Sequence, residues 1–218
     1  MRCGACLSPT DPIPSLPGWD ACRVCGSETN TAAYLPDDYG AGYVAELLAA
    51  EGADPAANHQ HTADWVERHD PGKPGGLVLD VGCGAGTTLA VLRSRGWAAV
   101  GWDVSAAGRP PGTVVSQEFR ADLFRRPFDA VACREVLEHA PDPHRLLREL
   151  AAAVAPGGVL HLTTPRPIAD KTEWRVYQPL HLCVWSPLAL RAALVSAGFE
   201  SLEFEEWELG QRIVCGRA

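Results

Sequence analysis

A chain of 218 residues can bury one hydrophobic core and has room for little more than a small extra module. A net charge of −8 and scattered basic residues argue against a nucleic-acid partner, because binding to a phosphate backbone depends on clustered Lys and Arg. No apolar run approaches the roughly 20 residues of a membrane-spanning helix, and the N-terminus lacks a secretory signal. We therefore expect a cytoplasmic protein that acts on a small-molecule substrate, without nucleic acid or membrane as partner.

Residues 1–30 carry two Cys-x-x-Cys pairs, formed by Cys3 with Cys6 and by Cys22 with Cys25. In a cytosolic chain this spacing indicates metal ligands before disulfides, because four thiolates can surround one tetrahedral Zn²⁺ at about 2.3 Å. The segment has few apolar residues for a core, so the metal would supply its folding energy. Four Cys ligands leave no open coordination position. We predict a structural zinc-binding module, with a redox-active Cys pair as the alternative.

A helical segment on the substrate side is expected over residues 31–75. The spacing of apolar residues predicts one helix over about Ala41–Ala50 and a second over Ala57–His69. Tyr39 and Tyr43 lie in this segment and are candidates for closing over a ligand. Packing in the core is the alternative for both tyrosines.

Strand-like apolar runs and amphipathic helices alternate over residues 76–218, which predicts a parallel sheet with helices on both faces. Asp142 and Ser186, each followed by proline, can cap two of the helices. Pro156–Gly158 is expected to end the helix before the fifth strand. The last two strands would form an antiparallel hairpin. The expected strands are Leu77–Val81, Ala98–Trp102, Val114–Glu118, Phe128–Cys133, Val159–Thr163, Ser201–Trp207 and Gln211–Cys215.

The sharpest local pattern is the glycine loop, Asp80-Val81-Gly82-Cys83-Gly84-Ala85-Gly86, between the first predicted strand and its helix. Glycines there let the backbone approach a ligand closely and direct amides at it. Asp103 ends the next strand, where a carboxylate can accept both hydroxyls of a ribose. Asp80 would repel a pyrophosphate but suits a cationic ligand such as S-adenosylmethionine (SAM). A tight turn without any ligand is the alternative.

This glycine loop resembles the first motif of the class I SAM-dependent methyltransferases. Four later segments, Gly101–Ser105, Ala121–Leu123, Phe128–His139 and Pro156–Leu160, are similar to further motifs of that family in the same order and spacing. The resemblance implies an α/β fold, with a seven-stranded Rossmann-like sheet, helices on both faces and a C-terminal antiparallel hairpin, beside the small zinc-binding module. It also implies SAM as cofactor.

The resemblance further implies which residues hold SAM. Asp103 would bind the ribose, Asp122 the adenine amino group, and the glycines the methionine moiety. The implied cofactor-binding residues are Asp80, Gly82, Cys83, Gly84, Gly86, Asp103, Val104, Asp122, Leu123 and Arg134.

Methyl transfer is an in-line displacement, so the protein must align the acceptor and, for a hydroxyl or an acidic carbon, remove a proton. The acceptor pocket is expected beyond the carboxyl ends of the fourth and fifth strands. His181, in a polar insertion after the fifth strand, is the first candidate for the base, and His139 is the second. A structural role in its own loop is the alternative for each histidine.

Glu135, Glu138 and His139 resemble the acidic cluster of ubiquinone-biosynthesis O-methyltransferases, where it can hold a divalent cation. The leading hypothesis is methylation of a biosynthetic or natural-product intermediate at oxygen, nitrogen or carbon. Similar zinc modules occur in some deoxysugar C-methyltransferases and in a class of ribosomal-RNA guanine methyltransferases. An RNA methyltransferase and a non-catalytic SAM-fold scaffold are therefore the alternatives.

Overall fold

The apolar runs that follow residue 76 pair into one large sheet, as the sequence predicts. The computed structural model describes residues 1–33, 55–69, 75–105, 109–206 and 210–217. The strands of the large sheet are β4 (Leu77–Val81), β5 (Ala98–Asp103), β6 (Thr113–Val115), β7 (Phe128–Arg134), β8 (Val154–Pro165), β10 (Glu200–Glu206) and β11 (Gly210–Gly216). They lie in the order β10-β11-β8-β7-β4-β5-β6.

The inner strands of this sheet are parallel and one edge is antiparallel. β4 pairs in parallel with β5 and β7, and the same direction continues into β6 and β8. β11 runs antiparallel to β8 and to β10. The predicted seven-stranded α/β sheet with a C-terminal hairpin is therefore confirmed. Its parallel strands all end at one edge, which is where ligands bind in such folds.

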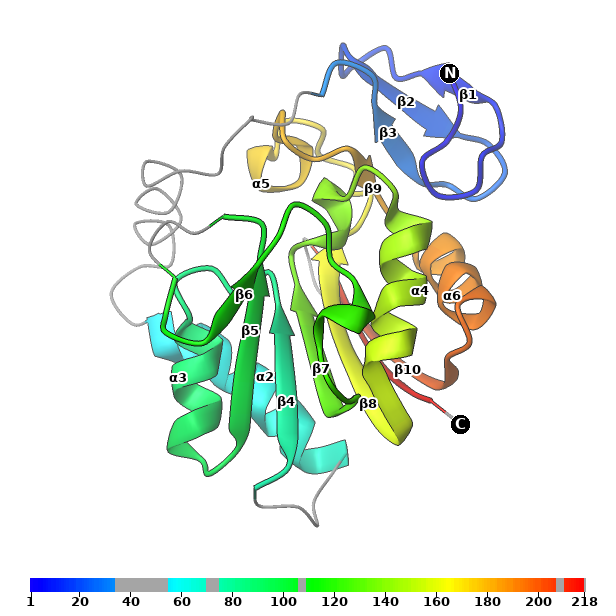
Figure 1. The fold of residues 1–218 in the computed structure, drawn as a ribbon. Coiled ribbons are helices and arrows are strands. Elements are labelled where there is room, and N and C mark those ends of the chain that lie inside the picture. The colour runs from blue at the N-terminus through cyan, green and yellow to red at the C-terminus, as the bar shows by residue number, and fades with distance from the viewer. Residues whose placement is uncertain (34–54, 70–74, 106–108, 207–209, 218) are drawn as a thin grey trace.

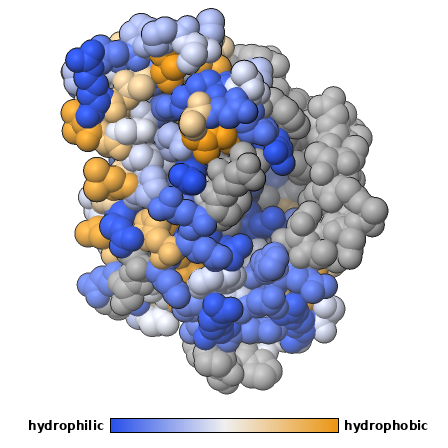
Figure 2. Space-filling model, turned by 180° about the vertical axis from the view of Figure 1, so that it is seen from behind, coloured by the Kyte–Doolittle hydropathy of each residue, from blue (hydrophilic) through white to orange (hydrophobic). Residues whose placement is uncertain are grey.

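Helices cover both faces of the large sheet (Figure 1). The long helices are α2 (Pro55–His69), α3 (Thr87–Ser94), α4 (Pro143–Ala153) and α6 (Pro187–Ser196). Short helical turns are η1 (Ala121–Leu123), η2 (Leu137–His139) and α5 (Trp174–Tyr177). The surface seen from behind is mostly hydrophilic, with apolar colour confined to separate patches (Figure 2). No helix among the described residues is long and apolar enough to cross a membrane.

The two predicted helix caps are confirmed. The Asp142 carboxylate accepts a hydrogen bond from the Arg145 amide at 2.9 Å, and the Ser186 hydroxyl accepts one from the Ala189 amide at 3.2 Å. Each cap satisfies an amide that has no partner inside the helix. Both helices therefore begin where their local sequence predicts.

The start of β8 differs from the prediction. Pro156–Gly158 does not end α4, because α4 ends at Ala153 and β8 already begins at Val154. The pairing of β7 with β8 shifts register close to this point, so the extra residues form a bulge in β8. β6 is also shorter than predicted. The helix expected over Ala41–Ala50 lies outside the described residues.

The N-terminal module has a sheet of its own, and one of its strands comes from the distant part of the chain. β1 (Thr10–Pro12), β2 (Trp19–Cys22) and β3 (Glu28–Asn30) are joined by β9 (Cys183–Val184) in the order β1-β2-β3-β9. Figure 1 shows this small sheet beyond the carboxyl ends of the parallel strands. The division of the chain at residues 30 and 75 stays a prediction.

Candidate cofactor and catalytic site

The glycine loop connects β4 to α3 in a conformation that requires glycine. The φ angles of Gly82, Gly84 and Gly86 are 74°, 53° and 85°, all in the left-handed region that side chains disfavour. A Cβ atom at Gly82 would lie 2.3 Å from a methyl carbon of Val136, and one at Gly86 would lie 2.5 Å from the Pro110 ring. The loop is thus closely covered by two other segments, one of which leads to η2.

Asp103, the predicted ribose ligand, is already engaged by hydrogen bonds. Its Oδ2 accepts from the Gly84 amide at 3.0 Å, and its Oδ1 accepts from the Ser105 amide at 3.0 Å and from Arg109 Nη2 at 2.8 Å. The side chains of Arg109 and Asp103 are only 6% and 7% exposed. A carboxylate oxygen has two lone pairs, so Oδ1 has no acceptor capacity left. A ribose that uses both oxygens must displace Arg109, which the sequence analysis did not single out.

Asp80 lies in β4 and is almost fully buried. Burial raises the pKa of this carboxyl to about 7, against the opposing effect of the Arg134 guanidinium. Nη1 of Arg134 lies 2.5 Å from Nδ1 of His59 on α2. Nδ1 of His59 also lies 2.8 Å from the Thr88 hydroxyl. Arg134 therefore contacts α2 and acts on Asp80 through its charge, and its predicted contact with SAM remains a prediction.

The residue predicted to bind the adenine amino group, Asp122, lies at the surface. Asp122 is exposed in η1, and its carboxylate pairs with the Arg120 guanidinium. Leu123 beside it is 39% exposed, whereas Val104 is half-buried directly after Asp103. The cofactor roles of these residues, of the glycines and of Cys83 stay predictions.

His139 and His181 meet at the carboxyl ends of the parallel strands. Their ring centroids are 4.7 Å apart, with an interplanar angle of 73°. Nδ1 of His139 lies 3.0 Å from the Leu180 carbonyl oxygen, and Nδ1 of His181 lies 2.8 Å from the Val176 carbonyl oxygen. A ring nitrogen that faces a carbonyl oxygen must carry the proton, so Nε2 of each neutral ring has a free lone pair.

Burial keeps both imidazoles neutral near neutral pH. It lowers the pKa of His139, and it lowers that of His181 to about 3, with the neighbouring His139 as the second cause. His181 is only 2% exposed, whereas His139 is partly exposed. Of the two rings, His139 therefore presents more of its surface to an incoming molecule.

Glu138 lies beside the two histidines and is completely buried. Its Oε2 accepts a hydrogen bond from the Thr164 hydroxyl at 3.0 Å, while no described residue donates to Oε1. Burial, and then the charge of Glu135, raise the pKa of Glu138 well above its usual value. One ligand atom each from Glu138, His139 and His181 lie within 4.8 Å of one another. Glu135, predicted to belong to this cluster, is exposed and has a φ of 51°.

The four N-terminal cysteines converge, as their spacing predicts. Their sulfur atoms all lie within 4.8 Å of one another, with Cys3 and Cys25 at 3.6 Å and Cys6 and Cys22 at 3.5 Å. A zinc tetrahedron with Zn–S bonds of about 2.3 Å has sulfur–sulfur edges of about 3.8 Å. The donor set and these separations fit a structural zinc ion.

Residues 53–203, more than half of the chain, match the family described as "Methyltransferase domain". The chain belongs to the methyltransferase family. Its seven-stranded sheet with a C-terminal antiparallel hairpin is the one that the resemblance to class I SAM-dependent methyltransferases implied.

Curated relatives of this methyltransferase include ubiquinone biosynthesis O-methyltransferases. That of Erwinia tasmaniensis is 34% identical in an alignment of 114 residues that covers 46% of this chain and 47% of the relative. That of Idiomarina loihiensis is 32% identical in an alignment of 136 residues that covers 56% of this chain and 56% of the relative. The chain thus spans about half the length of the curated relatives it matches.

Solved structures show the same fold at low identity. The sugar N-methyltransferase KedS8 from Streptoalloteichus sp. ATCC 53650 has a TM-score of 0.62 and 22% identity, with coverage of 85% of this chain and 97% of KedS8. DesVI of Streptomyces venezuelae has a TM-score of 0.61 and 19% identity, covering 85% of this chain and all of DesVI (100%).

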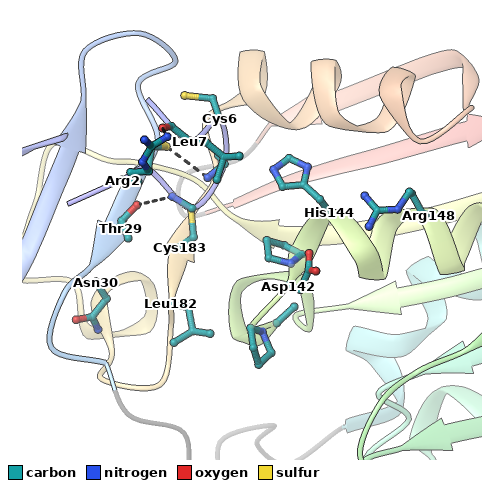
Figure 3. A pocket seen from close by; sticks show the side chains of 16 residues that line it. Arg2, Cys6, Leu7, Thr29, Asn30, Asp142, His144, Arg148, Leu182 and Cys183 are labelled. Carbon is teal, nitrogen blue, oxygen red and sulfur yellow. Dashed lines mark hydrogen bonds between the residues drawn. The ribbon is translucent and has the colours of Figure 1, made fainter. Parts of the chain in front are cut away.

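A groove of about 830 Å³ lies between the N-terminal module of the methyltransferase and the start of α4 (Figure 3). Its walls include Arg2 and Thr29 from the module, His144 and Arg148 from α4, and Cys183 from β9. None of the residues predicted to bind SAM lines it. The groove is therefore separate from the candidate cofactor site.

Proposed function

We propose that this methyltransferase transfers the methyl group of SAM to a small-molecule acceptor, a biosynthetic or natural-product intermediate, with the His139–His181 pair as base. The observation that carries the proposal is the pair of neutral imidazoles whose Nδ1–H groups are both bound by backbone carbonyls. The names of the O-methyltransferase and sugar N-methyltransferase relatives support a small acceptor.

The loop that carries His139 lies directly against the glycine loop. Val136, three residues before His139, fills the space where Gly82 lacks a side chain. When bound, SAM supplies a methyl group activated by the sulfonium. Nε2 of the base accepts the proton of the acceptor as the new bond to the methyl group forms. The backbone bonds at Nδ1 hold each ring in the tautomer that this step requires.

We place His139 first and His181 second, which reverses the order of the sequence analysis. The reason is exposure, because residue His181 is 2% exposed and residue His139 is partly exposed. In this arrangement His139 accepts the proton, and His181 packs edge-on against it and fixes its orientation. Both residues would then be needed for turnover, and neither for binding of SAM.

A divalent cation at this site is the second candidate. Glu138, His139 and His181 offer one carboxylate and two imidazoles, and the Nδ1–H bonds to carbonyl groups are the outer contacts typical of ligating histidines. Such a donor set suits Mn²⁺ or Zn²⁺ better than Mg²⁺, which prefers oxygen ligands. A bound cation would occupy the lone pairs that the base needs, so the two roles exclude each other.

A screen of acceptors with His→Ala variants tests the proposal. Catechols and amino sugars are offered with SAM, and release of S-adenosylhomocysteine (SAH) is measured. We expect His139→Ala and His181→Ala to lower turnover by about a hundredfold, the scale of general base catalysis, while the calorimetric affinity for SAH stays within twofold. Wild-type turnover in both variants would refute the base. Turnover that requires added Mn²⁺, at constant zinc content, would favour the cation site.

A further inference from the structure

The zinc-binding module holds the chain segment that carries His181. β9 begins two residues after His181 and pairs with β3, opposite Glu28 and Thr29. Beyond the paired residues, the Asn30 amide donates to the Leu182 carbonyl at 3.0 Å, and Asn30 Nδ2 donates to the Pro179 carbonyl at 3.4 Å. The His181 backbone therefore lies between two contacts with the module.

A buried ion pair holds the preceding part of the same segment. Lys171 Nζ lies 2.6 Å from Glu28 Oε1 and also donates to the Tyr177 hydroxyl at 2.7 Å. The side chains of Glu28 and Lys171 are 8% and 19% exposed. The Tyr177 ring in turn packs edge-on against Trp19 of β2, with centroids 5.3 Å apart. The module thus contacts Lys171 by charge and Tyr177 of α5 by ring packing.

The far end of the segment is held by Cys25, one of the four predicted zinc ligands. The Ser186 hydroxyl donates to the carbonyl oxygen of Cys25, and the Ser186 amide donates to the Ser27 hydroxyl at 3.0 Å. Ser186 is also the cap of α6. A change in the backbone at Cys25 would therefore be transmitted to the end of β9 and to the start of α6.

This segment supplies the carbonyl groups that orient both histidines. Leu180 and Val176 accept the Nδ1–H bonds of His139 and His181, and the Leu182 amide donates to the Glu138 carbonyl at 2.7 Å. The glycine loop depends on other contacts. The backbone amides of Gly82 and Cys83, for example, both donate to the Trp102 carbonyl of β5.

We propose that Glu28 and Asn30 of the zinc-binding module are positioning residues for His139 and His181, so that the zinc ion controls turnover without controlling SAM binding. This inference rests on the proposed function. The physical reason is that the module has few apolar residues of its own, so a bound zinc ion would supply much of its folding energy. Loss of zinc would release residues 171–186 and hence the carbonyl groups that orient the two rings.

The test compares three variants of the full chain. Cys22→Ser removes a zinc ligand, Glu28→Gln removes the charge that faces Lys171 while zinc stays bound, and Arg23→Ala is the matched control. Arg23 is in the same module, but its side chain is 82% exposed and pairs only with Asp11 among the described residues. The measurements are zinc content, calorimetric SAH affinity, hydrogen exchange of residues 176–186, and the pKa of His139 and His181 by NMR.

We expect Glu28→Gln to keep one zinc ion and its SAH affinity within twofold. Its hydrogen exchange over residues 176–186 should rise, its turnover should fall at least tenfold, and both histidine pKa values should move up toward 6.5 as the rings gain solvent. Cys22→Ser should show the same changes more strongly, and Arg23→Ala none. Unchanged exchange and unchanged histidine pKa values in Glu28→Gln would overturn the inference. These two readouts need no acceptor, so they remain informative if the proposed function fails.

Discussion

Arg109 offers a sharp test of how the cofactor site works. The structure has its guanidinium on Asp103 Oδ1 at 2.8 Å, where one hydroxyl of a ribose would bind. In Arg109→Ala this competitor is gone, while the Gly84 and Ser105 amides still hold the Asp103 carboxylate. We therefore expect two opposite effects, a less stable protein that binds SAH more tightly.

Both magnitudes follow from the burial of the pair. Removing one partner of a buried ion pair lowers the free energy of unfolding by about 3–5 kcal/mol. The two amides that remain bound to Asp103 favour the lower end of this range. For a chain of this size, that loss corresponds to a fall of roughly 6–12 °C in Tm. A hydrogen bond to a charged group contributes about 1.5–3 kcal/mol. Displacing it is part of the cost of binding, and each 1.4 kcal/mol corresponds to about tenfold in affinity. We expect SAH affinity to rise about tenfold.

The assay is calorimetric titration with SAH beside thermal unfolding with and without SAH. Arg93→Ala is the matched control, because Arg93 donates only to the Ala99 carbonyl among the described residues. Arg93 lies near the C-terminal end of α3, whereas the glycine loop precedes the N-terminal end of that helix. That control should lose stability without a change in affinity. Weaker SAH binding in Arg109→Ala would refute the reasoning and make Arg109 a ligand of the cofactor instead of its competitor.

Three further predictions concern the same site. The pKa of Asp80 is raised to about 7 by burial, so its negative charge develops as the pH rises through that value. The affinity for cationic SAM should therefore rise from about pH 6 to 8. Isothermal titration across this range checks the prediction, and an affinity that does not change with pH would contradict it. The pKa values of His139 and His181 are lowered by burial, so the acidic limb of kcat/KM for the acceptor at saturating SAM should lie below about pH 6.5. A limb at or above that value would exclude both as the base. Gly82→Ala places a methyl group 2.3 Å from Val136 at a residue with a left-handed backbone. The SAH affinity of this variant should therefore fall at least about tenfold, or about 1.4 kcal/mol. An unchanged affinity would contradict this and show that the loop around Val136 can move aside.

Local patterns were enough to predict most of the elements. The strand over Leu77–Val81, the caps at Asp142 and Ser186 and the turn at the glycine loop depend on residues close together in the chain. Apolar periodicity and cap chemistry act over that range, so they can be interpreted without a fold. The spacing of the four cysteines likewise predicted their convergence, because two Cys-x-x-Cys pairs together supply the four thiolates that surround one zinc ion.

The prediction of β8 shows where local patterns mislead. Pro156–Gly158 has the composition of a helix end, but the chain is already paired with β7 from Val154 onward. Pairing with the neighbouring strand outweighs the local preference for a turn, and the surplus residues are taken up in a bulge.

Contacts between distant residues were decided only by the tertiary structure. Ser27 and Ser186 are 159 residues apart in the chain, yet they are hydrogen-bonded because β9 completes the sheet of the N-terminal module. The approach of His181 to His139 and the occupation of Asp103 by Arg109 have the same origin. Sequence determined which chemical groups this methyltransferase has and which strands carry them. Packing decided which groups meet, because strand pairing and burial bring together residues that no local periodicity relates.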